Sequence, residues 1–263
     1  MLDEKVIVII GGTTGIGRAA SAAFLAAGAQ VVAVGRTEAE AKAIQAELGA
    51  RLYAFAGDAR APETAPRAIA EAMARFGRMD GLYHVAGGSG RRAGDGPLHE
   101  LTPEGWAYTL DLNLTSVMLS NQAAVRHFLA NKQTGSILNT GSVLAYSPSP
   151  TYFTTHAYAA AKAALIGFSR AIAASYAPAG IRVNVLAPGL IETPMAQRAA
   201  QDPTIQAFVR TKQPLDGGRI GQPEDLTGLA TYFMSDASRF TTGQVIAIDG
   251  GWTVSEGQIP PES

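Results

Sequence analysis

The stretch VIVIIGGTTGIG (residues 6–17) contains the features that decide the fold. Its first part, residues 6–10, is a short apolar run rich in β-branched residues, which is typical of a strand buried on both faces. Glycines follow at positions 11, 15 and 17, and helix-forming residues then continue to Ala27, with Gly28 as the expected end of the helix. The stretch therefore predicts a strand, a tight glycine-rich turn and a helix.

The alternation of strands and helices continues along the chain. Thr37 with Glu40 predicts a capping box at the start of the second helix. We predict further strands at residues 31–34, 51–55, 81–87, 136–142, 181–189 and 244–251, and further helices at 37–48, 63–76, 102–131, 156–177 and 223–234. Seven strands alternating with helices predict an α/β fold, a Rossmann-type doubly wound parallel sheet with helices on both faces.

The expected domain organisation is simple. No composition shift or repeat divides the chain, so residues 1–254 are predicted to form a single dinucleotide-binding and catalytic domain. The segment near 190–222 has no clear periodicity and is predicted to be a lid over the substrate. Residues 255–263 are predicted to be a disordered tail.

Composition excludes several classes of protein. The 263 residues include no cysteine, which excludes a disulfide framework and a thiolate metal site. The net charge is −1 and no basic run resembles a nucleic-acid footprint. Acidic residues precede the five-residue apolar run at the N-terminus, and the apolar segment 157–177 contains Lys162 and Arg170. We therefore expect a cytoplasmic protein with no nucleic-acid partner, no membrane association and no required metal.

The glycine-rich turn suggests a ligand. Glycines at 11, 15 and 17 let the backbone turn tightly and approach a pyrophosphate, and the following helix offers unpaired N–H groups and the positive end of its dipole. A glycine-rich turn that binds nothing is the alternative, but its place between a strand and a helix favours a dinucleotide site. The spacing GxxxGxG differs from the GxGxxG of the long-chain dehydrogenases.

A second motif suggests proton-transfer chemistry. Tyr158 and Lys162 are four residues apart on a predicted helix, which places them on one face. A free phenol has a pKa of about 10, and we expect the nearby ammonium to lower it. Ser142 ends the preceding strand, and Asn113 lies in the predicted helix 102–131. A Tyr–Lys pair alone occurs by chance in many helices, so the interpretation depends on the whole set.

Taken together, these residues resemble the short-chain dehydrogenase/reductase family, from about Lys5 to Val254. The family pattern is TGxxxGIG, and here Ile10 occupies the position of its threonine. The resemblance implies that Ser142 orients the substrate, Tyr158 is the acid-base, Lys162 binds the ribose and lowers the tyrosine pKa, and Asn113 holds a water of a proton relay. The chain departs from the family at His84 and Val85, which replace two asparagines, and in the longer interval between Ser142 and Tyr158.

The resemblance also implies a nicotinamide cofactor. Gly35 stands where an acid would bind the ribose hydroxyls of NAD, and Arg36 follows it, which suits the phosphate of NADP. Thr14 argues the other way, because many NADP-binding relatives carry a basic residue there. NADP(H) is therefore favoured and NAD(H) stays possible. The implied cofactor-binding residues are Gly11, Thr13, Thr14, Gly15, Ile16, Gly17, Arg36, Asp58, Ala59, Ala86, Gly87, Tyr158, Lys162, Pro188, Gly189, Ile191 and Thr193.

We therefore predict an NAD(P)-dependent oxidoreductase that transfers a hydride between the cofactor and a carbonyl or secondary alcohol of a small molecule. The alternative is a catalytically silent dinucleotide-binding sensor or scaffold on the same fold. Enoyl reduction is disfavoured, because those relatives space Tyr and Lys by seven residues. The resemblance implies a homotetramer or homodimer formed through the helices 103–131 and 156–177.

Residues 88–100, 143–155 and 190–220 are expected to select the substrate, whose identity the sequence leaves open. Arg91 or Arg92 could meet an anionic substrate, but a flexible, solvated loop is the favoured interpretation of that segment.

Overall fold

A seven-stranded parallel sheet forms the centre of the protein, and the structure, a computed structural model, describes residues 1–257. The strand order is β3-β2-β1-β4-β5-β6-β7, which confirms the predicted fold class. The order reverses between β1 and β4, so ligands are expected beyond the carboxyl ends of these strands. The strands are β1 (Val6–Ile10), β2 (Gln30–Gly35), β3 (Leu52–Ala56), β4 (Gly81–His84), β5 (Gly135–Thr140), β6 (Ile181–Pro188) and β7 (Val245–Ile248).

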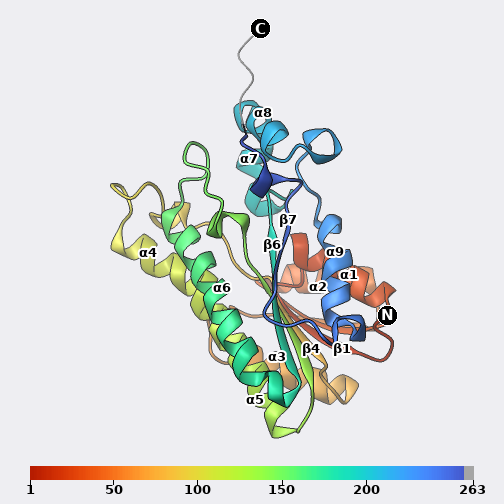
Figure 1. Cartoon of the computed structure of the whole chain (residues 1–263). Helices are drawn as coiled ribbons and strands as arrows, with labels where there is room; N and C mark the ends of the chain where they lie inside the picture. The colour runs from red at the N-terminus through yellow and green to blue at the C-terminus, as the bar shows by residue number, and fades with distance from the viewer. Residues whose placement is uncertain (258–263) are drawn as a thin grey trace.

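Helices cover both faces of the sheet (Figure 1). One face carries α1 (Gly15–Ala26), α2 (Glu38–Leu48) and α9 (Thr227–Met234), and the other carries α3 (Thr64–Phe76), α5 (Ser116–Ala130) and α6 (His156–Tyr176). The apolar run of β1 divides between the two layers: Ile7 and Ile9 pack with the first set, and Val6, Val8 and Ile10 pack with the second. Burial on both faces explains why β1 is continuously apolar.

Two helix predictions had different outcomes. The capping box of α2 is confirmed, since Thr37 accepts from the Glu40 N–H at 3.2 Å and Glu40 accepts from the Thr37 N–H at 3.3 Å. The single helix expected over 102–131 is instead α4 (Pro103–Leu110), a π-helical turn η2 (Asp111–Thr115) and α5. Within this region the Ser116 hydroxyl donates to the Leu112 carbonyl at 2.7 Å. Such back-bonding competes with the regular ladder, and π-turns often mark functional sites.

The segment 190–222 folds into short helices near the carboxyl ends of the strands. Phe208 and Trp252 belong to a separate apolar cluster there, with ring centroids 5.9 Å apart. The elements of this segment are η5 (Pro194–Ala196), α7 (Gln197–Gln201), α8 (Pro203–Lys212) and η6 (Leu215–Gly218), and η7 (Pro223–Leu226) follows it. Lys212 donates to the carbonyl of Ser255, so the described start of the predicted tail lies against α8. The rest of that tail, 258–263, lies outside the described residues.

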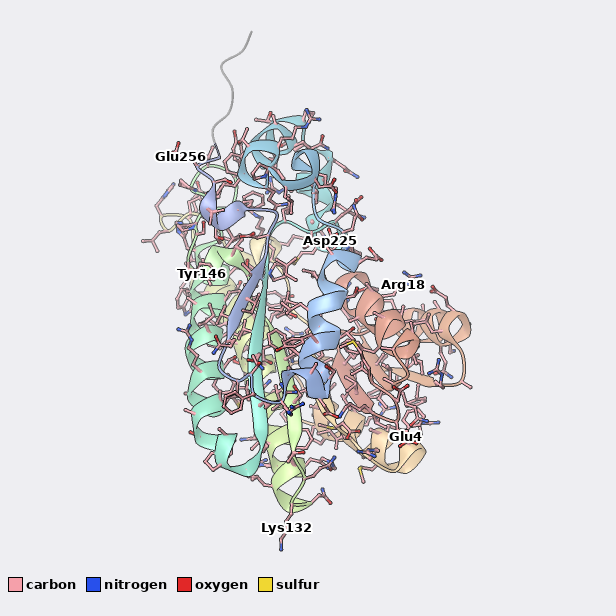
Figure 2. All side chains as sticks on the ribbon, turned by 45° about the vertical axis from the view of Figure 1, so that its right-hand side comes forward. Glu4, Arg18, Lys132, Tyr146, Asp225 and Glu256 are labelled. Carbon is pink, nitrogen blue, oxygen red and sulfur yellow. The ribbon has the colours of Figure 1, made fainter. Side chains whose placement is uncertain are left out.

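The remaining short elements are η1 (Arg91–Ala93), η3 (Val143–Ala145), η4 (Ala177–Ala179), η8 (Asp236–Ser238) and η9 (Trp252–Val254). Figure 2 shows the two ends of the sheet: Tyr146 and Asp225 lie toward the end that carries α7 and α8, and Glu4 and Lys132 lie toward the other.

Among residues 1–257, no helix is both long and apolar enough to cross a bilayer.

Candidate active site

The glycine-rich turn brings β1 close to β4. Gly11 has φ +87° and Gly15 has φ +49°, conformations that favour glycine. A Cβ atom at Gly11 would lie 2.6 Å from the backbone nitrogen of Ala86, and one at Gly17 would overlap the Gly11 carbonyl oxygen. Glycine is therefore required at these positions for the close approach of α1 and β4 to the turn.

The N-terminus of α1 is open. Thr14 is its N-cap residue, but its side chain makes no capping hydrogen bond, and the first turn contains no acidic residue. The N–H groups of this turn are thus available to an anion, which the helix dipole also favours. The glycine cradle and the open helix end fit the pyrophosphate of the dinucleotide that the sequence implies.

The end of β2 excludes an acidic side chain. A Cβ atom at Gly35 would lie 2.5 Å from Cγ2 of Thr13, which is itself buried. Arg36 follows with an exposed side chain that makes no hydrogen bond or ion pair within residues 1–257. In contrast, Asp58 at the end of β3 is held by Arg60, with 2.7 Å between carboxylate oxygen and guanidinium nitrogen. Hydrogen bonds from Arg60 lower the pKa of Asp58, which stays ionised.

The predicted catalytic tyrosine lies beside the predicted lysine. The Nζ atom of Lys162 is 5.6 Å from the ring centroid of Tyr158 and donates to the Thr140 carbonyl at 2.8 Å. Burial raises the pKa of Tyr158 to about 12, and hydrogen bonding with Ser142 lowers it only in part. The expected lowering of this pKa is therefore wrong for the chain alone, because burial dominates. The Tyr158 phenol is therefore protonated at neutral pH, and part of its surface stays accessible.

Burial also lowers the pKa of Lys162 to about 8, from its usual 10.5. Below pH 8 the folded protein holds a buried ammonium, and the desolvation of this charge lowers the free energy of unfolding by its full amount. Between pH 8 and 10.5 the lysine is protonated in the unfolded chain but neutral in the folded protein, so the destabilisation by Lys162 becomes smaller as the pH rises. We expect the free energy of unfolding of wild type, relative to Lys162→Met, to increase by up to about 3 kcal/mol across that window. Chemical denaturation at several pH values measures this, and a constant difference would contradict the lowered pKa.

Asn113 is the residue that the π-turn positions. Its Nδ2 atom donates to the carbonyls of Gly88 and Thr109, both at 2.9 Å, and its Oδ1 atom accepts from the Gly88 N–H at 3.0 Å. A Cβ atom at Gly87 would lie 2.8 Å from Oδ1 of Asn113 and 3.4 Å from Nζ of Lys162. Asn113 and Lys162 therefore meet at Gly87. The direct role of Asn113 in this structure is to hold the loop that follows β4.

The end of β6 meets the glycine-rich turn. Pro188 is the last residue of β6, and the Gly189 N–H donates to the Ile248 carbonyl at 3.0 Å. Thr193 lies against Gly15, because a Cβ atom there would be 3.2 Å from Thr193 Cγ2. Ile191 is buried and bridges to Gly221. The structure thus places Thr193, in the segment after β6, beside Gly15 of the glycine-rich turn.

His84 replaces a family asparagine and makes its own network. Its Nε2 atom lies 3.0 Å from the Ala86 carbonyl, which can only accept, so Nε2 carries the proton. Nδ1 is then an acceptor 2.7 Å from the Ser120 hydroxyl. Burial, together with the charge of Lys162, lowers the pKa of His84 to about 3, so the ring is neutral. His84 thereby ties the end of β4 to α5.

Asp95 is a residue of the site that sequence reasoning missed. It is buried, and its carboxylate accepts from the N–H groups of Ala157 and Tyr158, both at 3.0 Å. The loop expected to be flexible is therefore anchored to the first turn of α6, the helix that carries Tyr158. Asp95 lies more than 60 residues before the helix it caps, so no local capping pattern could show this contact.

We expect Asp95→Ala to lower kcat by at least about 10-fold, because a small misplacement of the reacting group is costly. Loss of the cap should also lower the free energy of unfolding by about 1–2 kcal/mol. The matched control is Asp80→Ala. In the wild type the Asp80 carboxylate accepts a hydrogen bond from the Val6 N–H at 2.9 Å, at the opposite end of the sheet. Steady-state kinetics and denaturation compare the two variants. Equal kcat values for both would show that Asp95 is a structural cap only.

The family model described as "Enoyl-(Acyl carrier protein) reductase" matches residues 11–253. A 2,5-dichloro-2,5-cyclohexadiene-1,4-diol dehydrogenase of Sphingobium indicum is 34% identical over 253 residues, which cover 96% of this chain and 98% of the relative. A cis-4-hydroxycyclohexanecarboxylate dehydrogenase of Sinomonas cyclohexanicum is 33% identical over 253 residues, covering 95% and 97%. Nearly the whole chain is therefore similar to proteins named as dehydrogenases.

Solved structures agree with these relatives. A short-chain type dehydrogenase/reductase from Mycobacterium ulcerans superposes with a TM-score of 0.88 at 30% identity, covering 97% of this chain and 92% of that one. A 3-ketoacyl-(acyl-carrier-protein) reductase from Brucella melitensis, complexed with NADH, gives a TM-score of 0.84 at 28% identity and covers 97% and 100%. The similarity includes the elements that form the site.

Proposed function

The chain belongs to the short-chain dehydrogenase/reductase family of NAD(P)-dependent oxidoreductases, and we propose that it interconverts a secondary alcohol and a ketone with Tyr158 as the acid-base. One observation carries this proposal: Tyr158, Ser142 and Lys162 gather at the carboxyl end of β5, beside the glycine cradle at the end of β1. The loop after β4 connects the two sets, because Ala86 lies against Gly11 of the turn and Gly87 lies against Lys162.

The nicotinamide supplies or accepts the hydride when bound. In reduction, the Tyr158 phenol donates its proton to the carbonyl oxygen, and its raised pKa keeps that proton available at neutral pH. In oxidation the same residue must act as a phenolate, so alkaline pH favours this direction. Ser142 orients the substrate oxygen, and Lys162 would bind the ribose beside Gly87.

The four-residue spacing of Tyr158 and Lys162 supports carbonyl reduction over the enoyl reduction named by the matching family model. Two relatives favour a narrower class, because both are named for alcohols on a six-membered carbon ring. We extend the proposal accordingly to a cyclic secondary alcohol or ketone. An assay of cyclohexanol derivatives and cyclohexanones with either nicotinamide tests it, and turnover of acyclic substrates alone would contradict it.

We propose NADP(H) as the preferred cofactor. Arg36 offers an unpaired, exposed guanidinium, and the packing of Gly35 on Thr13 leaves no room for the acid that would repel a 2′-phosphate. Arg36→Gln should then lower kcat/KM for NADPH by about 10–100-fold and leave the value for NADH within about 2-fold. Kinetics with both cofactors measure this ratio. Better kcat/KM with NADH in the wild type would overturn the preference.

We also propose a cytoplasmic homo-oligomer, a tetramer or dimer. Figure 1 shows α5 and α6 side by side on one flank of the molecule, where Ala163, Ala164 and Gly167 are exposed. These small residues permit close helix packing between two copies. Light scattering after size-exclusion chromatography determines the number of chains, and a monomer at micromolar concentration would contradict the proposal.

A further inference from the structure

Two arginines from separate segments converge on one backbone carbonyl. Arg91 of η1 and Arg198 of α7 each donate through Nη2 to the carbonyl of Tyr152, both at 3.3 Å. Tyr152 lies between Ser142 and Tyr158 in the chain, so both guanidiniums border the segment that joins these residues. The three segments involved are those expected to select the substrate.

These two positive charges have no carboxylate partner. Neither arginine forms an ion pair with any residue in the described part of the chain. Burial first, and then the charge of Arg198, lowers the pKa of Arg91. Asp95 is the negative charge that acts on Arg91, and its carboxylate is already engaged by two N–H groups of α6. A guanidinium has five N–H donors, so most of the donors of each arginine stay available to a ligand.

The two arginines lie on segments that connect to the surroundings of Tyr158. Asp95 follows Arg91 by four residues, so their Cα atoms are at most about 14 Å apart. The Asp95 carboxylate in turn accepts from the Tyr158 N–H. On the other side, a Cβ atom at Gly88 would lie 3.9 Å from Sδ of Met195, which brings the start of the Arg198 segment against the loop after β4. The segments that carry the two arginines therefore contact the loop that holds the Tyr158 N–H and the loop that follows β4.

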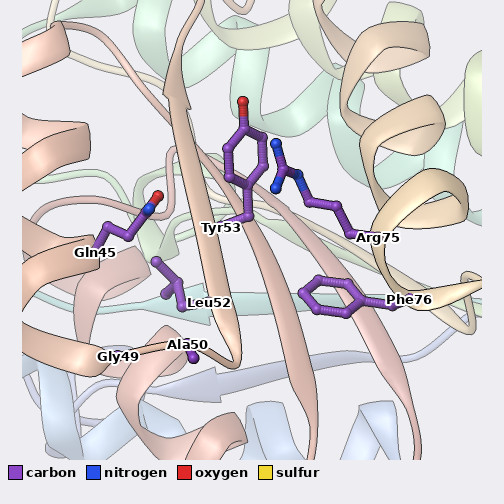
Figure 3. Close-up of a pocket in the computed structure, with 7 residues that line it drawn as sticks. All are labelled: Gln45, Gly49, Ala50, Leu52, Tyr53, Arg75 and Phe76. Atoms are coloured by element: carbon purple, nitrogen blue, oxygen red, sulfur yellow. The ribbon is translucent and has the colours of Figure 1, made fainter.

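The groove in Figure 3 contains an arginine whose charge is paired, and it can be compared with Arg91 and Arg198. It encloses about 560 Å³ between α2, β3 and the end of α3. Arg75 there stacks 3.4 Å from the Tyr53 ring and pairs with Glu71, and Gln45 accepts from the Ala54 N–H. The charge of Arg75 is thus paired with a carboxylate, whereas the charges of Arg91 and Arg198 have no carboxylate partner among the described residues.

We infer that Arg91 and Arg198 together bind a carboxylate of the substrate. This carboxylate would lie on the part of the substrate that is remote from its reacting carbon. A planar carboxylate placed between two guanidiniums would relieve their repulsion and take up their free donors. The inference rests on the proposed function, and it deepens that function by making the substrate a cyclic hydroxy acid or keto acid.

The test compares an acidic substrate with a neutral one. We would measure kcat/KM for cis-4-hydroxycyclohexanecarboxylate and for cis-4-methylcyclohexanol in wild type, Arg91→Gln, Arg198→Gln and the double variant. Each single change should lower kcat/KM for the acid by about 10–100-fold and leave the neutral alcohol within about 2-fold. The control, Arg92→Gln, changes an exposed neighbouring charge and should affect neither substrate. Equal losses on both substrates, or none, would overturn the inference.

A binding measurement separates this inference from the proposed reaction. Cyclohexanecarboxylate, which cannot react, should bind the wild type in ligand-observed NMR and lose its signal in the double variant, whether or not any alcohol is turned over. If the acid binds equally well to both proteins, the anion site is wrong even where the enzyme is active. If turnover is absent but arginine-dependent binding remains, the anion site stands and the proposed reaction fails.

Discussion

Tyr158→Phe is expected to lower kcat by about 100–10,000-fold, the usual contribution of a positioned acid-base group. The substitution removes one hydroxyl and keeps the ring beside Lys162, so the cofactor site should be undisturbed. Tyr158 is also among the implied cofactor-binding residues, and the loss of one neutral hydrogen bond costs only about 0.5–1.5 kcal/mol, so affinity for NADPH, measured by nicotinamide fluorescence, should fall by no more than about 10-fold. The loss belongs to the chemical step.

The matched control is Tyr176→Phe, the same chemical change near the other end of α6. Tyr176 packs against the apolar cluster between α3 and β6 and makes no side-chain hydrogen bond among the described residues. This variant should retain wild-type kcat. If Tyr158→Phe kept kcat within about 10-fold, another group would have to transfer the proton.

Gly17→Ala is expected to weaken dinucleotide binding by at least about 10-fold. The new Cβ atom would overlap the Gly11 carbonyl oxygen, so α1 or the turn must move. Either movement displaces the open N–H groups of α1 from the position that a pyrophosphate would occupy. Crowding should also lower the free energy of unfolding by about 1–3 kcal/mol. Fluorescence titration and denaturation measure the two effects.

Gly228→Ala provides the comparison. Gly228 is an exposed glycine within α9, and a Cβ atom there would meet nothing within 4 Å. This variant should bind dinucleotide as wild type does and be slightly more stable, since alanine favours a helix. Unchanged cofactor affinity in Gly17→Ala would show that the glycine turn is not the binding site.

Local patterns accounted for most of the fold. The capping box of α2 and the apolar run of β1 were readable because each depends on residues adjacent in the chain. The π-turn at Asn113 was not, because side-chain bonds to Thr109 and Gly88 interrupt a segment whose composition suits a continuous helix. Strand order needed the whole structure, although the alternation of elements had already indicated a parallel sheet.

The site shows the same division. The glycine spacing and the Tyr158–Lys162 pair could be recognised directly, and the structure brings these residues together. Asp95 could not be recognised, because an acidic residue in a glycine-rich loop has the pattern of a solvated turn until α6 is placed against it. The direction of the Tyr158 pKa shift also required the fold, since burial opposes the effect expected from a nearby ammonium.

The most direct test of the account follows the hydride itself. Cyclic secondary alcohols carrying deuterium on the carbinol carbon would be incubated with the protein and oxidised NADP, and the products analysed by mass spectrometry. The expected products are a ketone and a reduced cofactor that carries one deuterium. Oxidation of the alcohol without deuterium in the cofactor would contradict direct hydride transfer. Cofactor binding with no turnover of alcohol or ketone would contradict it too, and would favour a silent dinucleotide-binding protein.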